Sequence, residues 1–207
     1  FTPVIWKGWD VLFFALFYFL SFVIIVNLCK YFLPSFAKNQ EYFFRLFIYW
    51  TANAFCLFSL LFFLSFVPGY DKKTLGIQSL GSKKFLGAIL GYIAFLPWYL
   101  FLFYFAHLLF AVFSLEPQAQ EVAQEILKSE GYTYWFAVTT VILIAPLIEE
   151  FLFRAFFYGA IRDYFGVFFS ILITSVVFSI MHHNLFAFLP ILGLGIFLQI
   201  LYEKSQC

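Results

Sequence analysis

Long stretches without a charged residue dominate this chain of 207 residues. A helix needs about 20 apolar residues to cross the roughly 30 Å of hydrocarbon in a bilayer. Such a chain cannot hide its apolar surface from water, so lipid must be its solvent. The stretches free of Lys, Arg, Asp and Glu cover residues 11–29, 46–70, 85–115, 131–148 and 164–202.

The last stretch is too long for one crossing, because it would measure about 59 Å as a helix. Its polar segment His182-His183-Asn184 and Pro190 offer the break. The pattern therefore predicts an all-α, polytopic bundle of about six spans within a single membrane domain, residues 1–207. We place these spans near residues 10–32, 43–67, 84–113, 132–160, 165–183 and 186–203.

Composition narrows the class of protein further. Hydrophobic residues make up 64% of the chain and charged residues 11%, and the net charge is only +1. No basic field is available for nucleic acid, so we expect no nucleic-acid partner and take membrane lipid as the surroundings. The cysteines Cys29, Cys56 and Cys207 show no paired spacing, which argues against a disulfide framework or a cysteine zinc site.

Three ionisable residues interrupt the apolar run that follows Pro146: Glu149, Glu150 and Arg154. Facing lipid at the bilayer centre, each would cost about 2.5–3.5 kcal/mol, so they must face protein or water. In an α-helix Glu150 and Arg154 are neighbours four residues apart, and we expect them to pair. Glu149 points about 100° away from Glu150 and is therefore the better candidate for a reactive carboxylate.

The next apolar run ends in Phe178-Ser179-Ile180-Met181-His182-His183-Asn184. A histidine can hold a water molecule, donate to an oxyanion or ligate a metal. A glutamate beside His182 could serve as a general base, and together the two could hold and deprotonate a water molecule, the minimum equipment for peptide hydrolysis without a serine or cysteine nucleophile. A divalent metal such as zinc at Glu149 and His182 would suit these side chains, but only two strong ligands are visible.

Residue chemistry alone leaves two alternatives open. A Glu–Arg pair in membrane helices can simply lock them together, as in a catalytically inactive immunity or scaffold protein. Buried carboxylates also relay ions and protons, as in a small-solute or ion transporter. His107, alone among apolar residues, is expected to pack rather than to act in catalysis.

Together, Glu149-Glu150-x-x-x-Arg154 and Phe178-x-x-x-His182 resemble the first two motifs of the CAAX-protease and bacteriocin-processing (CPBP) family, which includes the type II CAAX prenyl endopeptidases. The resemblance covers roughly residues 72–207 and includes Leu75-Gly76-Ile77 and Gly193-x-Gly195.

This resemblance implies an intramembrane endopeptidase, expected in a prokaryotic cytoplasmic membrane, that cuts a membrane-tethered or hydrophobic peptide. It implies that Glu149 activates water, that His182 positions it, that Glu150 and Arg154 orient the site, and that Phe178 packs against the substrate pocket. A further family motif, a histidine four residues before an asparagine, is not found, since Ala187 stands four residues after His183. We expect the family core to be truncated at its C-terminal end here.

Overall fold

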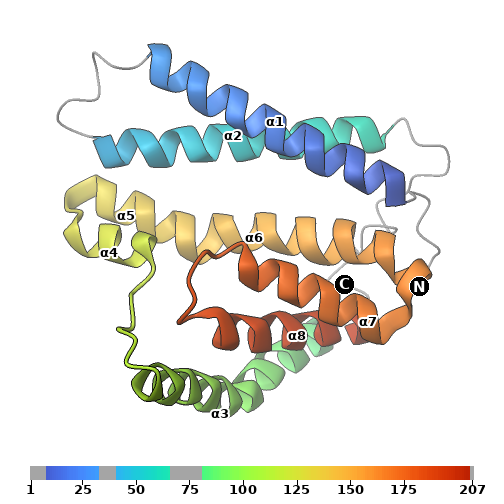
Figure 1. Ribbon diagram of the computed structural model, residues 1–207. Helices are drawn as coiled ribbons and strands as arrows, with labels where there is room; N and C mark the ends of the chain where they lie inside the picture. Colours follow the sequence, from blue (N-terminus) through green and yellow to red (C-terminus); the bar gives the residue numbers. More distant parts are fainter. Residues whose placement is uncertain (1–7, 33–40, 66–80, 206–207) are drawn as a thin grey trace. The chain divides into compact units, whose positions relative to one another are not determined.

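The part of the protein that the structure describes consists of helices joined by turns and short loops, with no strand (Figure 1). The computed structural model describes residues 8–32, 41–65 and 81–205. The predicted all-α class is confirmed. The segments in chain order are α1 (Gly8–Phe32), α2 (Glu41–Leu64), α3 (Ser82–Val112), α4 (Glu121–Lys128), α5 (Gly131–Thr139), η2 (Thr140–Ile144), α6 (Ala145–Glu149), η3 (Glu150–Tyr158), α7 (Gly159–Ile180) and α8 (Phe188–Ser205).

The chain divides into two compact units, which are described separately. The first unit holds α3, α7, α8 and η3 from Phe153 onward; the second holds α1, α2, α4, α5, η2, α6 and η3 as far as Leu152. The organisation as a single membrane domain stays a prediction. The resemblance at Leu75-Gly76-Ile77 lies outside the described residues.

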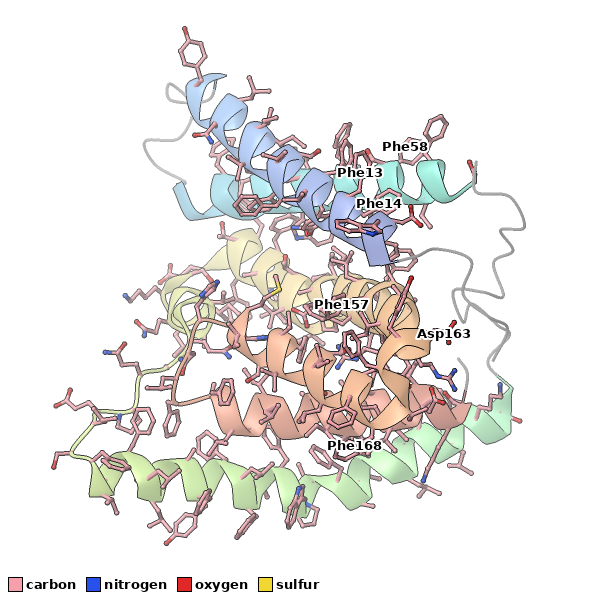
Figure 2. All side chains as sticks on the ribbon, turned by 45° about the vertical axis from the view of Figure 1, so that its right-hand side comes forward. Phe13, Phe14, Phe58, Phe157, Asp163 and Phe168 are labelled. Carbon is pink, nitrogen blue, oxygen red and sulfur yellow. The ribbon has the colours of Figure 1, made fainter. Side chains whose placement is uncertain are left out.

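Three described helices are long and apolar enough to cross a membrane: Lys84–Val112, Gly131–Ile180 and Phe188–Ser205. Large apolar side chains are widely exposed, for example Phe13, Phe58 and Phe168, whose exposed fractions are 58%, 68% and 72% (Figure 2). Lipid is the solvent that such surfaces fit. The helices α1 and α2 coincide with the first two predicted spans, while the total of about six crossings is not confirmed.

Polar contacts connect the helices of the second unit. The Tyr18 hydroxyl of α1 donates to the side-chain oxygen of Asn53 on α2, and Asn53 is buried. The indole N–H of Trp50 donates to Thr140 Oγ1 over 2.5 Å, and its ring stacks on Phe136. Interhelical hydrogen bonds of this kind hold helices together where lipid supplies no hydrophobic drive for their association.

Two stretches of π-helix flank the short helix α6, which contains Pro146. The segment η2 ends just before α6, and η3 begins directly after it. A proline cannot donate a backbone hydrogen bond, and a wider turn is one way to accommodate it. The predicted carboxylates therefore stand at a change of helix type: Glu149 ends α6 and Glu150 begins η3.

Gly166 interrupts α7, close to the division predicted between residues 160 and 165. Its backbone has φ 70° and ψ 172°, which no helix contains and which glycine adopts at little cost. At the other end, α7 stops at Ile180, and Asn184 Oδ1 accepts the Ala187 N–H at the start of the next helix. The break predicted around His182–Asn184 is confirmed.

Helices α7 and α8 lie side by side in the first unit (Figure 1) and approach most closely at Gly195. A Cβ atom at Gly195 would lie 3.3 Å from the Ser175 Cα and 3.3 Å from the Phe178 ring. Small residues at such contacts allow two helix backbones to pack closely. Gly195 therefore sets the distance between α8 and the helix that carries Phe178.

Replacement of Gly195 by leucine should destabilise the protein by about 1–3 kcal/mol, because the added side chain meets α7 backbone. Gly87 in α3 has no atom within 4 Å of its would-be Cβ, so Gly87→Leu is the matched control. Thermal unfolding in detergent should show a lower melting temperature for Gly195→Leu alone. Equal melting temperatures for both variants would contradict the close α7–α8 contact.

Candidate active site

The guanidinium group of Arg154 lies in the interior of the first unit. Arg154 is only 1% exposed, and its Cζ atom lies 4.5 Å from the centroid of the Phe178 ring. Arginine is rarely buried so completely without a partner, and the face of an aromatic ring attracts its charge. The structure thus brings together Arg154 of the first sequence motif and Phe178 of the second.

Phe178 is held on several sides. Its ring is 4% exposed, and the Phe153 ring contacts it edge to face at 5.1 Å between centroids. The close approach of α8 at Gly195 closes another side. A ring packed in this way has few alternative positions, so the arginine that lies over it is fixed as well.

His182 stands one turn beyond Phe178 and turns back toward it. The ring centroids of the two side chains lie 4.7 Å apart, and His182 Nδ1 is 2.8 Å from the carbonyl oxygen of Phe178. Because a carbonyl oxygen only accepts hydrogen bonds, Nδ1 must be the nitrogen that carries the hydrogen. In the neutral imidazole the other nitrogen, Nε2, then presents a lone pair that can accept a hydrogen bond from water.

The neighbouring His183 has a different environment. It is exposed, and its φ of 48° places it in the left-handed region at the end of α7. Non-glycine residues adopt this conformation uncommonly, with Asn, Asp and His enriched among them. The structure therefore distinguishes two adjacent histidines: one contacts the Arg154–Phe178 pair, and the other ends the helix.

Glu149 and Glu150 belong to the second compact unit, where both are half-buried. The prediction of an α-helical Glu150–Arg154 spacing was wrong in one respect, since Glu150–Tyr158 is a π-helix. Its hydrogen bonds join residues five apart, so each turn is wider than the α-helical turn assumed from sequence. The pairing of Glu150 with Arg154 stays a prediction, as do the roles of both glutamates.

The described residues contain no group of three or more His, Cys, Asp or Glu side chains that could hold a metal ion. Protein zinc sites use at least three such ligands. Within this part of the chain, Glu149 and His182 therefore have no third such side chain with which to hold a metal. The imidazole of His107 contacts the Phe186 ring at 6.3 Å between centroids, as its predicted packing role requires.

A second polar cluster was missed by the sequence interpretation. The buried Tyr158 hydroxyl donates to Glu203 Oε2 over 2.6 Å, and Arg162 NH2 donates to Glu203 Oε1 over 2.7 Å. Arg162 and Glu203 are charges at the ends of apolar runs, but nothing in the sequence pairs them. These contacts fasten the C-terminal end of α8 to the start of α7.

The comparisons with known proteins concern the C-terminal part of the chain. Residues 131–207 match the family model described as "Type II CAAX prenyl endopeptidase Rce1-like". A Bacillus subtilis (strain 168) protein named "Putative membrane peptidase YdiL" is 33% identical over 64 residues, which are 31% of this chain. The chain matches about a quarter, 26%, of the length of that relative.

No solved structure matches the chain significantly. The family match begins at Gly131, so residues 72–130 of the predicted resemblance stay outside it. It contains both motifs, from Glu149 to Arg154 and from Phe178 to His182. Residues 131–207 are therefore Rce1-like in sequence, and the family resemblance predicted from the two motifs is confirmed over this part of the chain.

Proposed function

We propose that the protein is an intramembrane endopeptidase that hydrolyses a peptide bond with a water molecule activated by Glu149 and held by His182. The packing of buried Arg154 and half-buried His182 against the same Phe178 ring is the observation that carries the proposal. The Rce1-like match over residues 131–207 supports the same activity. An inert scaffold or a transporter has no comparable support.

In the proposed reaction, Nε2 of His182 accepts a hydrogen bond from the water. Nε2 is able to accept because the hydrogen of the neutral imidazole is on Nδ1, which donates to the Phe178 carbonyl. The Glu149 carboxylate removes a proton from this water as it attacks the scissile carbonyl carbon. The C–N bond then breaks, and the proton passes from Glu149 to the leaving amine. No covalent enzyme intermediate is needed.

Arg154 and Glu150 act as positioning residues in this proposal. Arg154 holds the Phe178 ring in place. The backbone carbonyl of Phe178 in turn orients His182. A misplacement of about 1 Å can cost a hundredfold in rate, so an orienting contact matters even without touching substrate. Glu150, next to the base in sequence, would balance the charge of Arg154.

The substrate class that we propose is a peptide tethered to the membrane by a lipid or by its own apolar segment. Both motifs lie within or directly beside the candidate span Gly131–Ile180. A peptide held at the bilayer reaches such a site at a high effective concentration. A prenylated C-terminal peptide is the natural first probe, since it joins a lipid to a short peptide.

The two adjacent histidines allow a matched test. His182→Ala should lower cleavage of a fluorogenic prenylated peptide in detergent by about 10²–10⁴-fold, the usual contribution of a proton-transfer group. His183→Asn should keep full cleavage, because His183 is exposed and asparagine tolerates its left-handed backbone. Equal loss in both variants, or loss in His183→Asn alone, would refute the role assigned to His182.

The carboxylates can be tested in the same assay. Glu149→Gln removes the base while keeping the side-chain shape, and we expect cleavage to fall by about 10²-fold or more. Glu130→Gln, which changes an exposed glutamate at the start of α5, should leave the rate unchanged. Full cleavage by a folded Glu149→Gln protein would exclude Glu149 as the base.

A double-mutant cycle tests Arg154 as a positioning residue. Arg154→Lys and Phe178→Leu should couple by about 1–2 kcal/mol in unfolding free energy, because the first removes the planar guanidinium that stacks on the ring and the second removes the ring. Phe168→Leu, on the exposed face of the same helix (Figure 2), should not couple with Arg154→Lys. The kcat of Arg154→Lys should fall while KM changes little; a change confined to KM would contradict positioning.

A further inference from the structure

A buried glutamine, Gln199, lies on α8 in the first unit. Gln199 is 0% exposed, and neither its Nε2 nor its Oε1 has a hydrogen-bond partner among the described residues. The hydroxyl groups of Ser170, which is 0% exposed, and Ser175, which is 1% exposed, are buried and unpartnered in the same way. The proposed proteolysis uses none of these three side chains, and close helix packing needs only that Ser170 and Ser175 be small, not that they be polar.

The contacts on either side show which way Gln199 faces. Four residues before it, Gly195 packs against Ser175 and Phe178 of α7. Four residues after it, Glu203 binds Arg162 of α7. Residues four apart share one helix face, so Gln199 faces α7 between these two contacts.

The partner on α7 follows from the antiparallel pairing of the two helices. Gly195 is opposite Ser175, and Glu203 is opposite Arg162. The midpoint between them on α8 is near Gln199, and on α7 it lies close to Ser170. By this pairing Gln199 is at about the level of Ser170, and Ser175 lies about one turn farther along α7.

A carboxamide and two hydroxyls that lack partners are costly in an apolar interior, and still more so where lipid replaces water outside. Internal water molecules occur at such places and make about three hydrogen bonds each to otherwise unsatisfied groups. The donor and acceptor inventory fits, because the amide offers both an N–H and a carbonyl, and each hydroxyl can donate or accept. Thr174, by contrast, already donates to the Ser170 carbonyl.

We propose that Gln199, Ser170 and Ser175 form a binding site for internal water in the α7–α8 interface. The water bridges the two helices through hydrogen bonds and fixes α8 against the helix that carries Phe178. The site does not depend on proteolysis, and it is separate from the water that would be consumed at His182. It also gives a buried glutamine a defined purpose within an apolar helix.

Stability measurements in detergent test the shared water. Gln199→Met and Ser170→Ala should each lower the melting temperature, and the double variant should lower it by less than their sum, because either change already breaks the same bridge. Gln118→Met, at an exposed glutamine, is the control and should leave the melting temperature unchanged. Higher melting temperatures for both single variants would overturn the proposal, because they would show that no stabilising water is lost when these side chains are replaced.

An experimental structure of the wild-type protein in lipid gives a second readout that does not depend on variants. The proposal requires a water peak within hydrogen-bond distance of both the Gln199 amide and Ser170 Oγ. Direct contact between these side chains, with no peak between them, would overturn it.

Discussion

The structure depends on one constraint: polar side chains inside apolar helices need interaction partners. Lipid offers no hydrogen bonds, so each buried charge or amide must be satisfied by the protein or by enclosed water. Arg154 lies over the Phe178 ring, Glu203 binds Tyr158 and Arg162, and Asn53 accepts from Tyr18. These contacts, more than apolar packing, give each group of helices a defined arrangement.

The cluster around Phe178 shows how one side chain can organise a candidate site. Its ring receives the Arg154 cation, its backbone carbonyl selects the His182 tautomer, and Gly195 brings α8 against it. Catalysis in this proposal would therefore depend on a residue that contributes no reactive atom. Such dependence is expected where proton transfer requires donors and acceptors within tenths of an ångström.

Much of the fold follows from the sequence because apolar run length and charge placement are local signals. They predict the long helices and the break at His182–Asn184. They also predict Arg154 and His182 as special, since ionisable groups are costly in such runs, whereas Phe178 was predicted only from the family resemblance. The π-helix Glu150–Tyr158 was not predicted, because an α-helical period is assumed whenever a run is apolar.

The contacts between segments that are distant in sequence could not be predicted from the sequence either. Nothing local connects Arg162 to Glu203 or brings Gly195 against Ser175, because these contacts depend on how α8 returns along α7. A π-helical turn beginning at Glu150 changes the direction of every later side chain in that segment, and π-turns occur often at functional sites.

The distance between a Glu149 carboxylate oxygen and His182 Nε2 tests the central claim most directly. It can be measured in an experimental structure of the protein in a lipid bilayer. Two hydrogen bonds through one shared water predict a separation of about 5–6 Å, with that water between the two groups. Side chains that point into separate cavities, beyond the reach of a single water, would contradict the proposed hydrolytic mechanism.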